Sequence, residues 1–171
     1  MEKILIVIDM QNDFIDGALG TKEAVSIVEN FKAKIKSYPK KAVFATMDTH
    51  GPDYLETQEG KNLPVEHCIR GTSGWWIRPD IAELLDSARV YEKPTFGSVR
   101  LAEDLKEIKG LEEVEIVGLC TDICVVSNAL LIKAELPEVK ISVDTSCCAG
   151  VTPEKHAAAL ETMRSCQIQV K

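Results

Sequence analysis

The sequence predicts an α/β protein: a three-layer α/β/α sandwich around a mostly parallel sheet of five or six strands. Short runs rich in β-branched residues alternate with amphipathic helical stretches along the chain. Runs such as ILIVI (4–8) and VEIVGL (114–119) are apolar at nearly every residue, which is typical of strands covered on both faces. Strand–helix alternation of this kind implies βαβ units with right-handed crossovers. The expected fold is therefore Rossmann-like.

Each element is expected where one of these two patterns is sustained. The aliphatic and β-branched runs predict strands, in order, at residues 3–9, 41–47, 88–92, 114–120 and 140–144, with a last candidate at 167–170. Between them, apolar residues at helical spacing predict helices at residues 24–37, 79–86, 101–108, 122–136 and 153–165. No internal repeat, low-complexity segment or linker interrupts this order, so residues 1–171 are expected to form a single domain.

The composition is that of an ordinary soluble globular protein, with 45% hydrophobic and 27% charged residues. The net charge of −7 is spread among mixed charges, which argues against nucleic acid or an anionic membrane as a partner. The N-terminal apolar run is too short to span a membrane and too abrupt for a signal peptide. The six cysteines lack the spacing of a disulfide framework. We therefore expect a cytoplasmic protein in which most thiols are free and structural.

The stretch from Asp48 to about Ile77 breaks the alternation. It has no sustained periodicity, and it contains two of the three histidines together with four glycines and two prolines. A connection of this length inside a compact domain is usually functional or disordered. Because this one carries so many ionisable side chains, we favour a functional role.

Polar and reactive residues follow the ends of the expected strands. The first strand ends at Asp9, the second runs into residues 48–50, the third into 92–93, the fourth into 120–124, and the fifth ends at Asp144. In an open parallel sheet, ligands bind beyond the carboxyl ends of the strands, where the strand order reverses. The sequence therefore predicts a functional site at this edge.

Cys124 is the first candidate for chemistry at that edge. Thr121 and Asp122 are natural N-cap residues, which would place Cys124 in the first turn of the following helix. Unpaired N–H groups and the positive helix end would lower the pKa of the thiol and receive a developing oxyanion. The alternative is a buried structural cysteine without chemistry.

Asp9 and Lys93 each close a strand at the same edge. A carboxylate at the end of an apolar strand is costly to bury unless a positive charge meets it. Paired, these two residues would supply a general base for the thiol and a cation that keeps the base ionised. The alternative is a purely structural ion pair.

Asp48 and His50 stand just after a strand, with Glu56 and His67 further along the irregular stretch. Two imidazoles and two carboxylates are ligands typical of a divalent metal such as Zn, Mn or Fe. Such a metal would polarise a substrate ring nitrogen or carbonyl, or activate water. The alternative is that all four are solvated loop residues. His156, in a later helical pattern, is interpreted as an ordinary surface residue.

Taken together, these residues resemble a known family. The matching stretches, in order, are IVIDMQNDF (6–14), MDTH (47–50), LPVEHCIRGTSGW (63–75), YEKPTFGS (91–98) and GLCTDICV (118–125). Across essentially the whole chain, they are similar to the isochorismatase-like cysteine hydrolases, particularly the nicotinamidase branch. Cysteine at position 124 argues against the isochorismatase branch itself, whose members lack that nucleophile and cleave a vinyl ether.

The resemblance implies a role for each matching residue. Asp9 would be the general base, Lys93 its charged partner and Cys124 the nucleophile, with the backbone N–H groups of Cys120 and Cys124 as the oxyanion hole. A cis peptide bond would join Leu119 to Cys120. The metal, Zn with Mn or Fe as alternatives, would be held by the ligand set Asp48, His50, Glu56 and His67. The family also implies a homo-oligomer.

The implied reaction is hydrolysis of a small carboxamide, with nicotinamide as the leading substrate, through a cysteine thioester. Phe14 matches one of two aromatic residues that sandwich the pyridine ring in nicotinamidases. The second is usually a Trp shortly before the last metal histidine, where this chain has Leu63; Trp75 and Trp76 lie beyond it, and their role is open. Losing one stacking partner removes about 1 kcal/mol of ring recognition.

Other functions remain open from the sequence. A second hypothesis is an enzyme that uses the same Asp9, Lys93 and Cys124 but cleaves a ureido or carbamoyl amide. A non-hydrolytic thiol redox protein could use Cys120 and Cys124, although their spacing differs from the C-x-x-C redox motif. A catalytically silent binding module is a further alternative.

Overall fold

The computed structural model describes residues 3–171 and contains one sheet of six parallel strands. The strands are β1 (Lys3–Ile8), β2 (Val43–Asp48), β3 (Arg89–Lys93), β4 (Glu113–Leu119), β5 (Lys140–Ala149) and β6 (Gln169–Val170). The α-helices are α1 (Asn12–Ile15), α2 (Lys22–Ser26), α3 (Val28–Lys36), α4 (Gln58–Asn62), α5 (Pro79–Ala82), α6 (Val99–Lys106), α7 (Val126–Glu135) and α8 (Pro153–Ser165). The described residues also form three 3₁₀ turns and one π-helical turn. The 3₁₀ turns are η1 (Lys40–Ala42), η2 (Tyr54–Glu56) and η3 (Glu83–Leu85), and the π-helical turn is η4 (Thr121–Val125).

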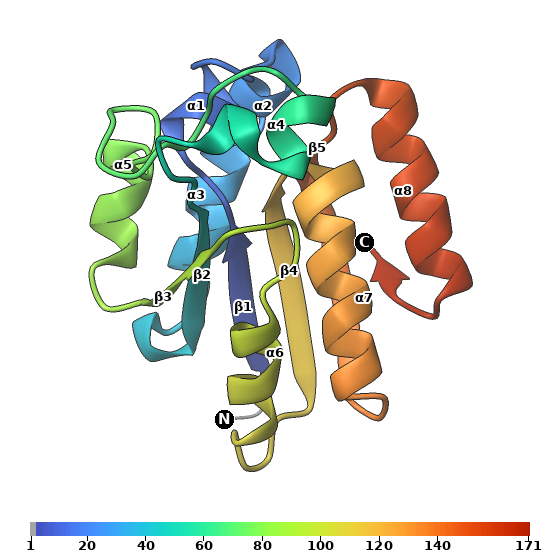
Figure 1. Ribbon diagram of the computed structural model, residues 1–171. Coiled ribbons are helices and arrows are strands. Elements are labelled where there is room, and N and C mark those ends of the chain that lie inside the picture. The colour runs from blue at the N-terminus through green and yellow to red at the C-terminus, as the bar shows by residue number, and fades with distance from the viewer. Residues whose placement is uncertain (1–2) are drawn as a thin grey trace.

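Helices cover both faces of the sheet, as Figure 1 shows, so the predicted three-layer α/β/α fold class is confirmed. On one face, buried side chains of α3 and α5 pack on the strands, among them Phe31 and Ile81. On the other face, α6, α7 and α8 contribute Leu105, Ile132 and Met163 to a second apolar cluster. Burial on both sides explains why the central strands are almost continuously aliphatic.

The strand order β3-β2-β1-β4-β5-β6 reverses direction between β1 and β4. Ile8, the last residue of β1, is paired with Thr46 of β2 on one side and with Gly118 of β4 on the other. The loops after β1 and β4 therefore leave the sheet at its topological switch point, where open α/β sheets bind their ligands. Helices α1, α2 and α4 lie around this end of the sheet (Figure 1).

Two predicted elements away from the nucleophile turn differ from the structure. Strand β5 continues to Ala149, past a register irregularity opposite Ile116 and Gly118, so Asp144 lies within the strand and not at its carboxyl end. Asp144 instead pairs with Lys34 at 2.7 Å. The predicted helix 24–37 begins earlier, because the Thr21 hydroxyl accepts a hydrogen bond from the N–H of Ala24, and it is interrupted at Ile27.

All six cysteines are free thiols in this structure. Within the part of the chain that the structure describes, no helix has the length and apolar character needed to cross a membrane.

Candidate active site

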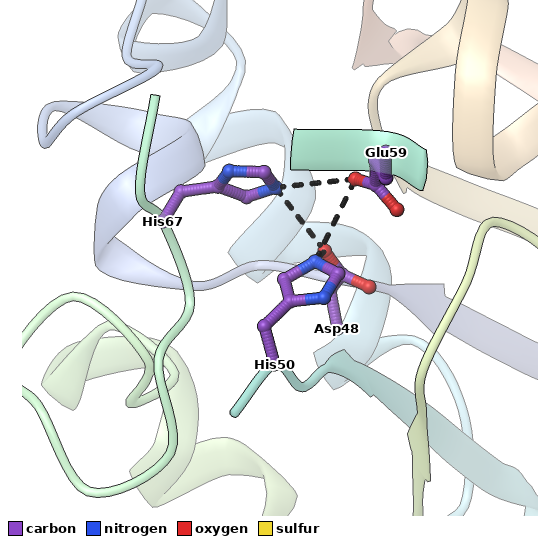
Figure 2. A group of neighbouring side chains, drawn as sticks. All are labelled: Asp48, His50, Glu59 and His67. Carbon is purple, nitrogen blue, oxygen red and sulfur yellow. Dashed lines mark hydrogen bonds and ion pairs between the residues drawn. The ribbon is translucent and has the colours of Figure 1, made fainter. Parts of the chain in front are cut away.

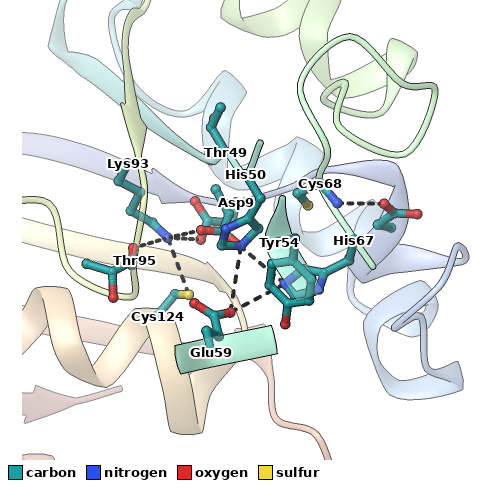
Figure 3. A network of polar contacts seen from close by, with 12 residues as sticks. Asp9, Thr49, His50, Tyr54, Glu59, His67, Cys68, Lys93, Thr95 and Cys124 are labelled. Atoms are coloured by element: carbon teal, nitrogen blue, oxygen red, sulfur yellow. Dashed lines mark hydrogen bonds and ion pairs between the residues drawn. The ribbon is translucent and has the colours of Figure 1, made fainter. Parts of the chain in front are cut away.

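Asp9, Lys93 and Cys124 meet at the switch point, although they come from three different elements (Figure 3). The ammonium Nζ of Lys93 lies 2.7 Å from Oδ2 of Asp9 and 3.4 Å from Sγ of Cys124. All three side chains are almost completely buried. A lysine, a carboxylate and a thiol therefore share one site from which water is largely excluded.

The local backbone places Asp9 at the centre of this group. Asp9 follows β1 with φ of +47°, in the left-handed region that non-glycine residues seldom occupy. Its Oδ1 accepts a hydrogen bond of 2.6 Å from the Thr46 hydroxyl on β2, which fixes the carboxylate and leaves Oδ2 facing Lys93. Lys93 in turn donates to the carbonyl of Thr95 at 3.0 Å. The strained backbone at Asp9 is thus held in place from both sides.

Burial and charge set the protonation of the three groups. Burial raises the pKa of Asp9, and the neighbouring Lys93 ammonium opposes that shift. Burial alone would lower the pKa of Lys93, but the charges of Asp9, Cys124 and Asp48 raise it above its usual value. Burial, and then the charge of Asp9, raise the pKa of the Cys124 thiol well above its usual value. The resting site therefore holds a neutral thiol beside an ion pair.

The turn that carries Cys124 differs from the sequence prediction. Residues 121–125 form the π-helical turn η4, in which neither Thr121 nor Asp122 caps a helix with its side chain. The Thr121 hydroxyl instead forms a 2.8 Å hydrogen bond with Nδ1 of His156, and Asp122 accepts one from the N–H of Val151. The prediction that the helix end lowers the pKa of Cys124 is wrong, because burial and Asp9 dominate. His156 is half-buried, so its interpretation as an ordinary surface residue is also wrong.

The backbone before this turn has the expected form. The peptide bond between Leu119 and Cys120 is cis, at the position that the resemblance indicated. The carbonyl of Cys120 accepts hydrogen bonds from the N–H groups of Ile123 and Val125, which closes the turn around Cys124.

A second cluster lies beside Lys93 and consists of Asp48, His50, Glu59 and His67 (Figure 2). One donor atom from each of the four residues lies within 4.8 Å of all the others. Nε2 of His50 is 2.8 Å from Oδ2 of Asp48, and Nε2 of His67 is 3.5 Å from the same oxygen. Oδ1 of Asp48 lies 3.4 Å from Nζ of Lys93, so Asp48 joins the two clusters.

The prediction that Glu56 belongs to this cluster is wrong. Glu56 is exposed on the 3₁₀ turn η2, whereas Glu59, in the first turn of α4, points its carboxylate at both imidazoles. Thr57 is the N-cap of helix α4, and its hydroxyl accepts a hydrogen bond from the N–H of Gly60. That N-cap is the sequence signal that would have favoured Glu59 over Glu56.

The donor set fits a divalent metal. Nδ1 of His67 hydrogen-bonds the carbonyl of Val65 at 2.8 Å, so it carries the ring proton and leaves Nε2 as a free lone pair toward the cluster. Tyr54 is fully buried and packs against the rings of both His50 and His67, at centroid distances of 4.8 and 5.0 Å. The sequence analysis did not predict a role for Tyr54, because no motif or spacing in the sequence marks it as part of the site.

A small cavity opens between the two clusters. Phe14, Leu19, Leu63, Phe96, Cys120 and Ile123 line it together with Cys124 and the cluster residues Asp48, Glu59 and His67. Phe14 therefore lies at the site, and the second aromatic ring is Phe96, which the sequence reasoning did not single out. Trp75 is buried but does not line the cavity, and its indole N–H donates a hydrogen bond to the Thr49 hydroxyl. Trp76 does not line the cavity either, and it is exposed.

Known proteins resemble this chain over nearly its whole length. A protein-family model, the isochorismatase domain, matches residues 3–170. The chain belongs to the isochorismatase family. This family member is 27% identical to a nicotinamidase/pyrazinamidase of Mycobacterium tuberculosis, over 98% of this chain and 97% of that protein. It is 30% identical to an uncharacterised isochorismatase family protein of Bacillus subtilis, over 94% and 93% of the two chains.

Solved structures resemble this isochorismatase-family protein over their full length. A nicotinamidase/pyrazinamidase from Bacillus subtilis superposes with a TM-score of 0.84 at 27% identity, covering 99% of each chain. A pyrazinamidase from Pyrococcus horikoshii, in complex with zinc, superposes with a TM-score of 0.82 at 26% identity, covering 100% of this chain and 99% of that one.

Proposed function

We propose that this protein is an amidohydrolase that cleaves the C–N bond of a small carboxamide, with nicotinamide as the leading substrate and nicotinic acid and ammonia as products. The observation that carries the proposal is the contact of the Lys93 ammonium with both the Asp9 carboxylate and the Cys124 thiol, inside a buried site. The likeness to nicotinamidases supports the choice of amide.

In the proposed first half-reaction, Cys124 attacks the amide carbonyl. Because the resting thiol is neutral, a base must accept its proton as the C–S bond forms. Oδ2 of Asp9 suits this role, since among the described residues it is the one buried side-chain oxygen or nitrogen without a well-aligned hydrogen bond. The backbone N–H groups of Cys120 and Cys124 stabilise the tetrahedral oxyanion. The protonated Asp9 then gives its proton to the departing ammonia, which leaves a thioester.

In the second half-reaction, Asp9 is again a base. Asp9 takes a proton from a water molecule as that water attacks the thioester. The C–S bond then breaks, Asp9 passes the proton to the departing Cys124 thiolate, and the carboxylic acid is released. Lys93 keeps Asp9 ionised in a buried site whose low polarity would otherwise favour the neutral acid. The three residues therefore act as one unit.

The second cluster is proposed to hold a divalent metal, with Zn as the leading candidate and Mn or Fe as alternatives. Asp48, His50, Glu59 and His67 would be its ligands. Such a metal would supply a positive charge that binds and polarises a substrate nitrogen or carbonyl beside the nucleophile.

Phe14 and Phe96 are proposed to hold the ring of the substrate. The cavity between them measures about 40 Å³, far below the roughly 300 to 1,000 Å³ typical of ligand pockets. Leu63 and Phe96 are partly exposed at its rim, with 39% and 42% of their surfaces accessible, so they are the side chains free to move aside for a ring.

The test is ammonia release from metal-loaded protein offered nicotinamide, benzamide, and aliphatic and ureido amides. We expect turnover of nicotinamide, loss of at least about 10³-fold in kcat for Cys124→Ala, and no loss for Cys166→Ala, which removes an exposed thiol. Mass spectrometry of acid-quenched wild type should show an acyl group on Cys124. Turnover of ureido amides alone would reject the substrate but keep the chemistry. Turnover that survives Cys124→Ala would reject the mechanism.

A further inference from the structure

The segment directly after Asp9 carries two polar side chains, Gln11 and Asp13, to which the proposed chemistry gives no role. Gln11 is completely buried, and its carboxamide makes three hydrogen bonds, all to backbone atoms. Its Oε1 accepts from the N–H of Asp48 at 2.7 Å, and its Nε2 donates to the carbonyls of Asp48 at 2.8 Å and Trp75 at 2.7 Å. A single side chain thus holds the Asp48 backbone by both of its polar groups, at the point where β2 ends.

Asp13 holds the other side of the metal cluster in a similar way. Its Oδ2 accepts from the N–H of Cys68 at 2.8 Å, and its Oδ1 from the N–H of Ala18 at 3.2 Å. Cys68 directly follows His67 and has φ of +48°, so the chain bends sharply there. A Cβ on Gly74 would lie 2.1 Å from the Asp13 carboxylate, so glycine at 74 is what lets Asp13 reach this position.

The two anchors are linked through the backbone. The carbonyl of Cys68 accepts from the N–H of His50 at 3.0 Å, and the N–H of Arg70 donates to the carbonyl of His50 at 2.9 Å. Gln11 therefore fixes Asp48, while Asp13 fixes Cys68, which is bonded to His50 and adjacent to His67. Three of the four cluster residues are tied to one short segment, and Glu59 on α4 is the exception.

We propose that Gln11 and Asp13 are positioning residues for the metal cluster, which set its affinity for a divalent cation without touching the cation or the substrate. The inference rests on the metal site proposed above. Carboxylate and imidazole donors bind a cation tightly only when their backbones are already fixed, because otherwise binding must supply the ordering entropy. Glutamine suits position 11 because a carboxylate there would face two carbonyl oxygens with no proton to offer.

The chain supplies a matched comparison in Asn128, a second fully buried carboxamide with three hydrogen bonds to the backbone. Its Oδ1 accepts from the N–H of Ser98, and its Nδ2 donates to the carbonyls of Phe96 and Cys124. Asn128 thus serves the nucleophile side of the site as Gln11 serves the metal side. Replacing either amide by an apolar side chain of similar shape removes the same number of bonds.

The experiment measures Zn²⁺ affinity of the metal-free full chain by competition with a chromophoric chelator, for wild type, Gln11→Met, Asp13→Asn and Asn128→Leu. We expect Gln11→Met to weaken Zn²⁺ binding about 10- to 100-fold, the range for residues that orient metal ligands. Asn128→Leu should keep the wild-type affinity and instead change the rate at which iodoacetamide alkylates Cys124. Thermal unfolding of each metal-free variant reports the loss of global stability, which should be similar for the two amide variants.

Equal Zn²⁺ affinities in all four proteins, or equal losses in Gln11→Met and Asn128→Leu, would overturn the inference. If Gln11→Met fails to fold, Asp13→Asn decides, since it keeps the size of the side chain but places an NH₂ group against a backbone donor. Absence of Zn²⁺ binding in wild type would overturn the metal site together with the inference. Absence of amidase activity in wild type that binds Zn²⁺ would reject only the proposed reaction.

Discussion

At the scale of single residues, burial and then the charge on Asp9 raise the pKa of Cys124. The carboxylate is buried beside the thiol and raises its pKa, while Lys93, 3.4 Å from Sγ, acts in the opposite sense. Burial, reinforced by Asp9, therefore keeps the nucleophile protonated at rest, and in the proposed mechanism Asp9 removes the thiol proton only when a substrate is attacked. A site built in this way protects the thiol from stray electrophiles, since the thiolate is the reactive form.

This coupling predicts that Asp9→Asn separates thiol reactivity from catalysis. Removing the negative charge leaves Lys93 as the nearest ionic neighbour, so the pKa of Cys124 should fall, and alkylation by iodoacetamide at pH 7 should become faster than in wild type. Amide turnover should nevertheless fall by about 10² to 10⁴-fold, because the general base is gone. The measurement pairs alkylation followed by mass spectrometry with ammonia release. Slower alkylation in the variant would show that Asp9 activates the resting thiol.

At the scale of elements, the contact between β1 and β4 sets the geometry of the switch point. Gly118 lies in β4 with φ of +128°, and a Cβ added there would lie 2.1 Å from the carbonyl oxygen of Ile8. Ile8 immediately precedes Asp9, and Gly118 lies just before the cis peptide bond. The absence of a side chain at 118 is therefore what allows the base and the nucleophile turn to approach each other.

Gly118→Ala is accordingly expected to destabilise the fold and to disrupt the site together. The matched control is Gly110→Ala, which also has a positive φ, of +70°, but has no atom within 4 Å of the added Cβ. Gly110→Ala should cost about 1 to 2 kcal/mol, the cost of a non-glycine residue in the left-handed region. Gly118→Ala should cost more than about 3 kcal/mol, because a backbone clash is added. Urea unfolding of both variants measures the difference, and equal costs would contradict a steric role for Gly118.

The elements also show what the sequence could predict. The sequence could place Asp9, Asp48, Lys93 and Cys124 at one edge of the sheet because each lies at or shortly after the end of a predicted strand, and a parallel sheet brings such ends together. The fold class followed from the same patterns.

Errors arose where tertiary contacts override local signals. Thr121 and Asp122 have the chemistry of helix caps, but their side chains bond to His156 and to the β5–α8 loop instead. Glu56 and Glu59 lie in a stretch without periodicity, where only the turn chemistry at Thr57 separates them. Phe96 reaches the cavity through a loop whose path no local pattern specifies.

At the scale of the whole molecule, charges are divided between the two ends of the sheet. The site occupies the carboxyl end, whereas a network of ion pairs lies near the starts of β1 and β4, where Glu115 is buried. Glu115 pairs with Lys3, Lys34 and Lys171 at 3.6, 3.3 and 3.5 Å, and it accepts a hydrogen bond from the hydroxyl of Tyr38. Burial favours its neutral form, but the Tyr38 bond and the lysines prevail and lower its pKa.

The neighbouring carboxylates behave in the same way. Burial would raise the pKa of Glu113 and of Asp144, but contacts with lysines lower it. Lys171 and Lys3 contact Glu113, Lys34 contacts Asp144, and the pKa of each carboxylate is lowered as a result. Asp9 is shifted the other way, because burial raises its pKa. Burial also raises the pKa of Glu59. Among the described carboxylates, lowered pKa values nevertheless outnumber these two raised ones, and below about pH 4.5 the unfolded chain binds more protons than the folded protein.

It follows that the free energy of unfolding should fall as the pH drops from about 5 to 3, and that Glu115 should account for part of the slope. A carboxylate whose folded pKa is depressed stabilises the protein above its unfolded pKa and loses that contribution on acidification. Glu115→Gln should therefore be less stable than wild type at pH 7, by about 1.5 to 3 kcal/mol for bonds to a charged group. The stabilities of the two proteins should converge by about pH 3.

Urea unfolding between pH 3 and 7 measures both curves. The control is Glu161→Gln, which removes an exposed ion pair with Arg164 and should follow wild type. Parallel curves for wild type and Glu115→Gln would mean that the buried network contributes by packing and not by charge.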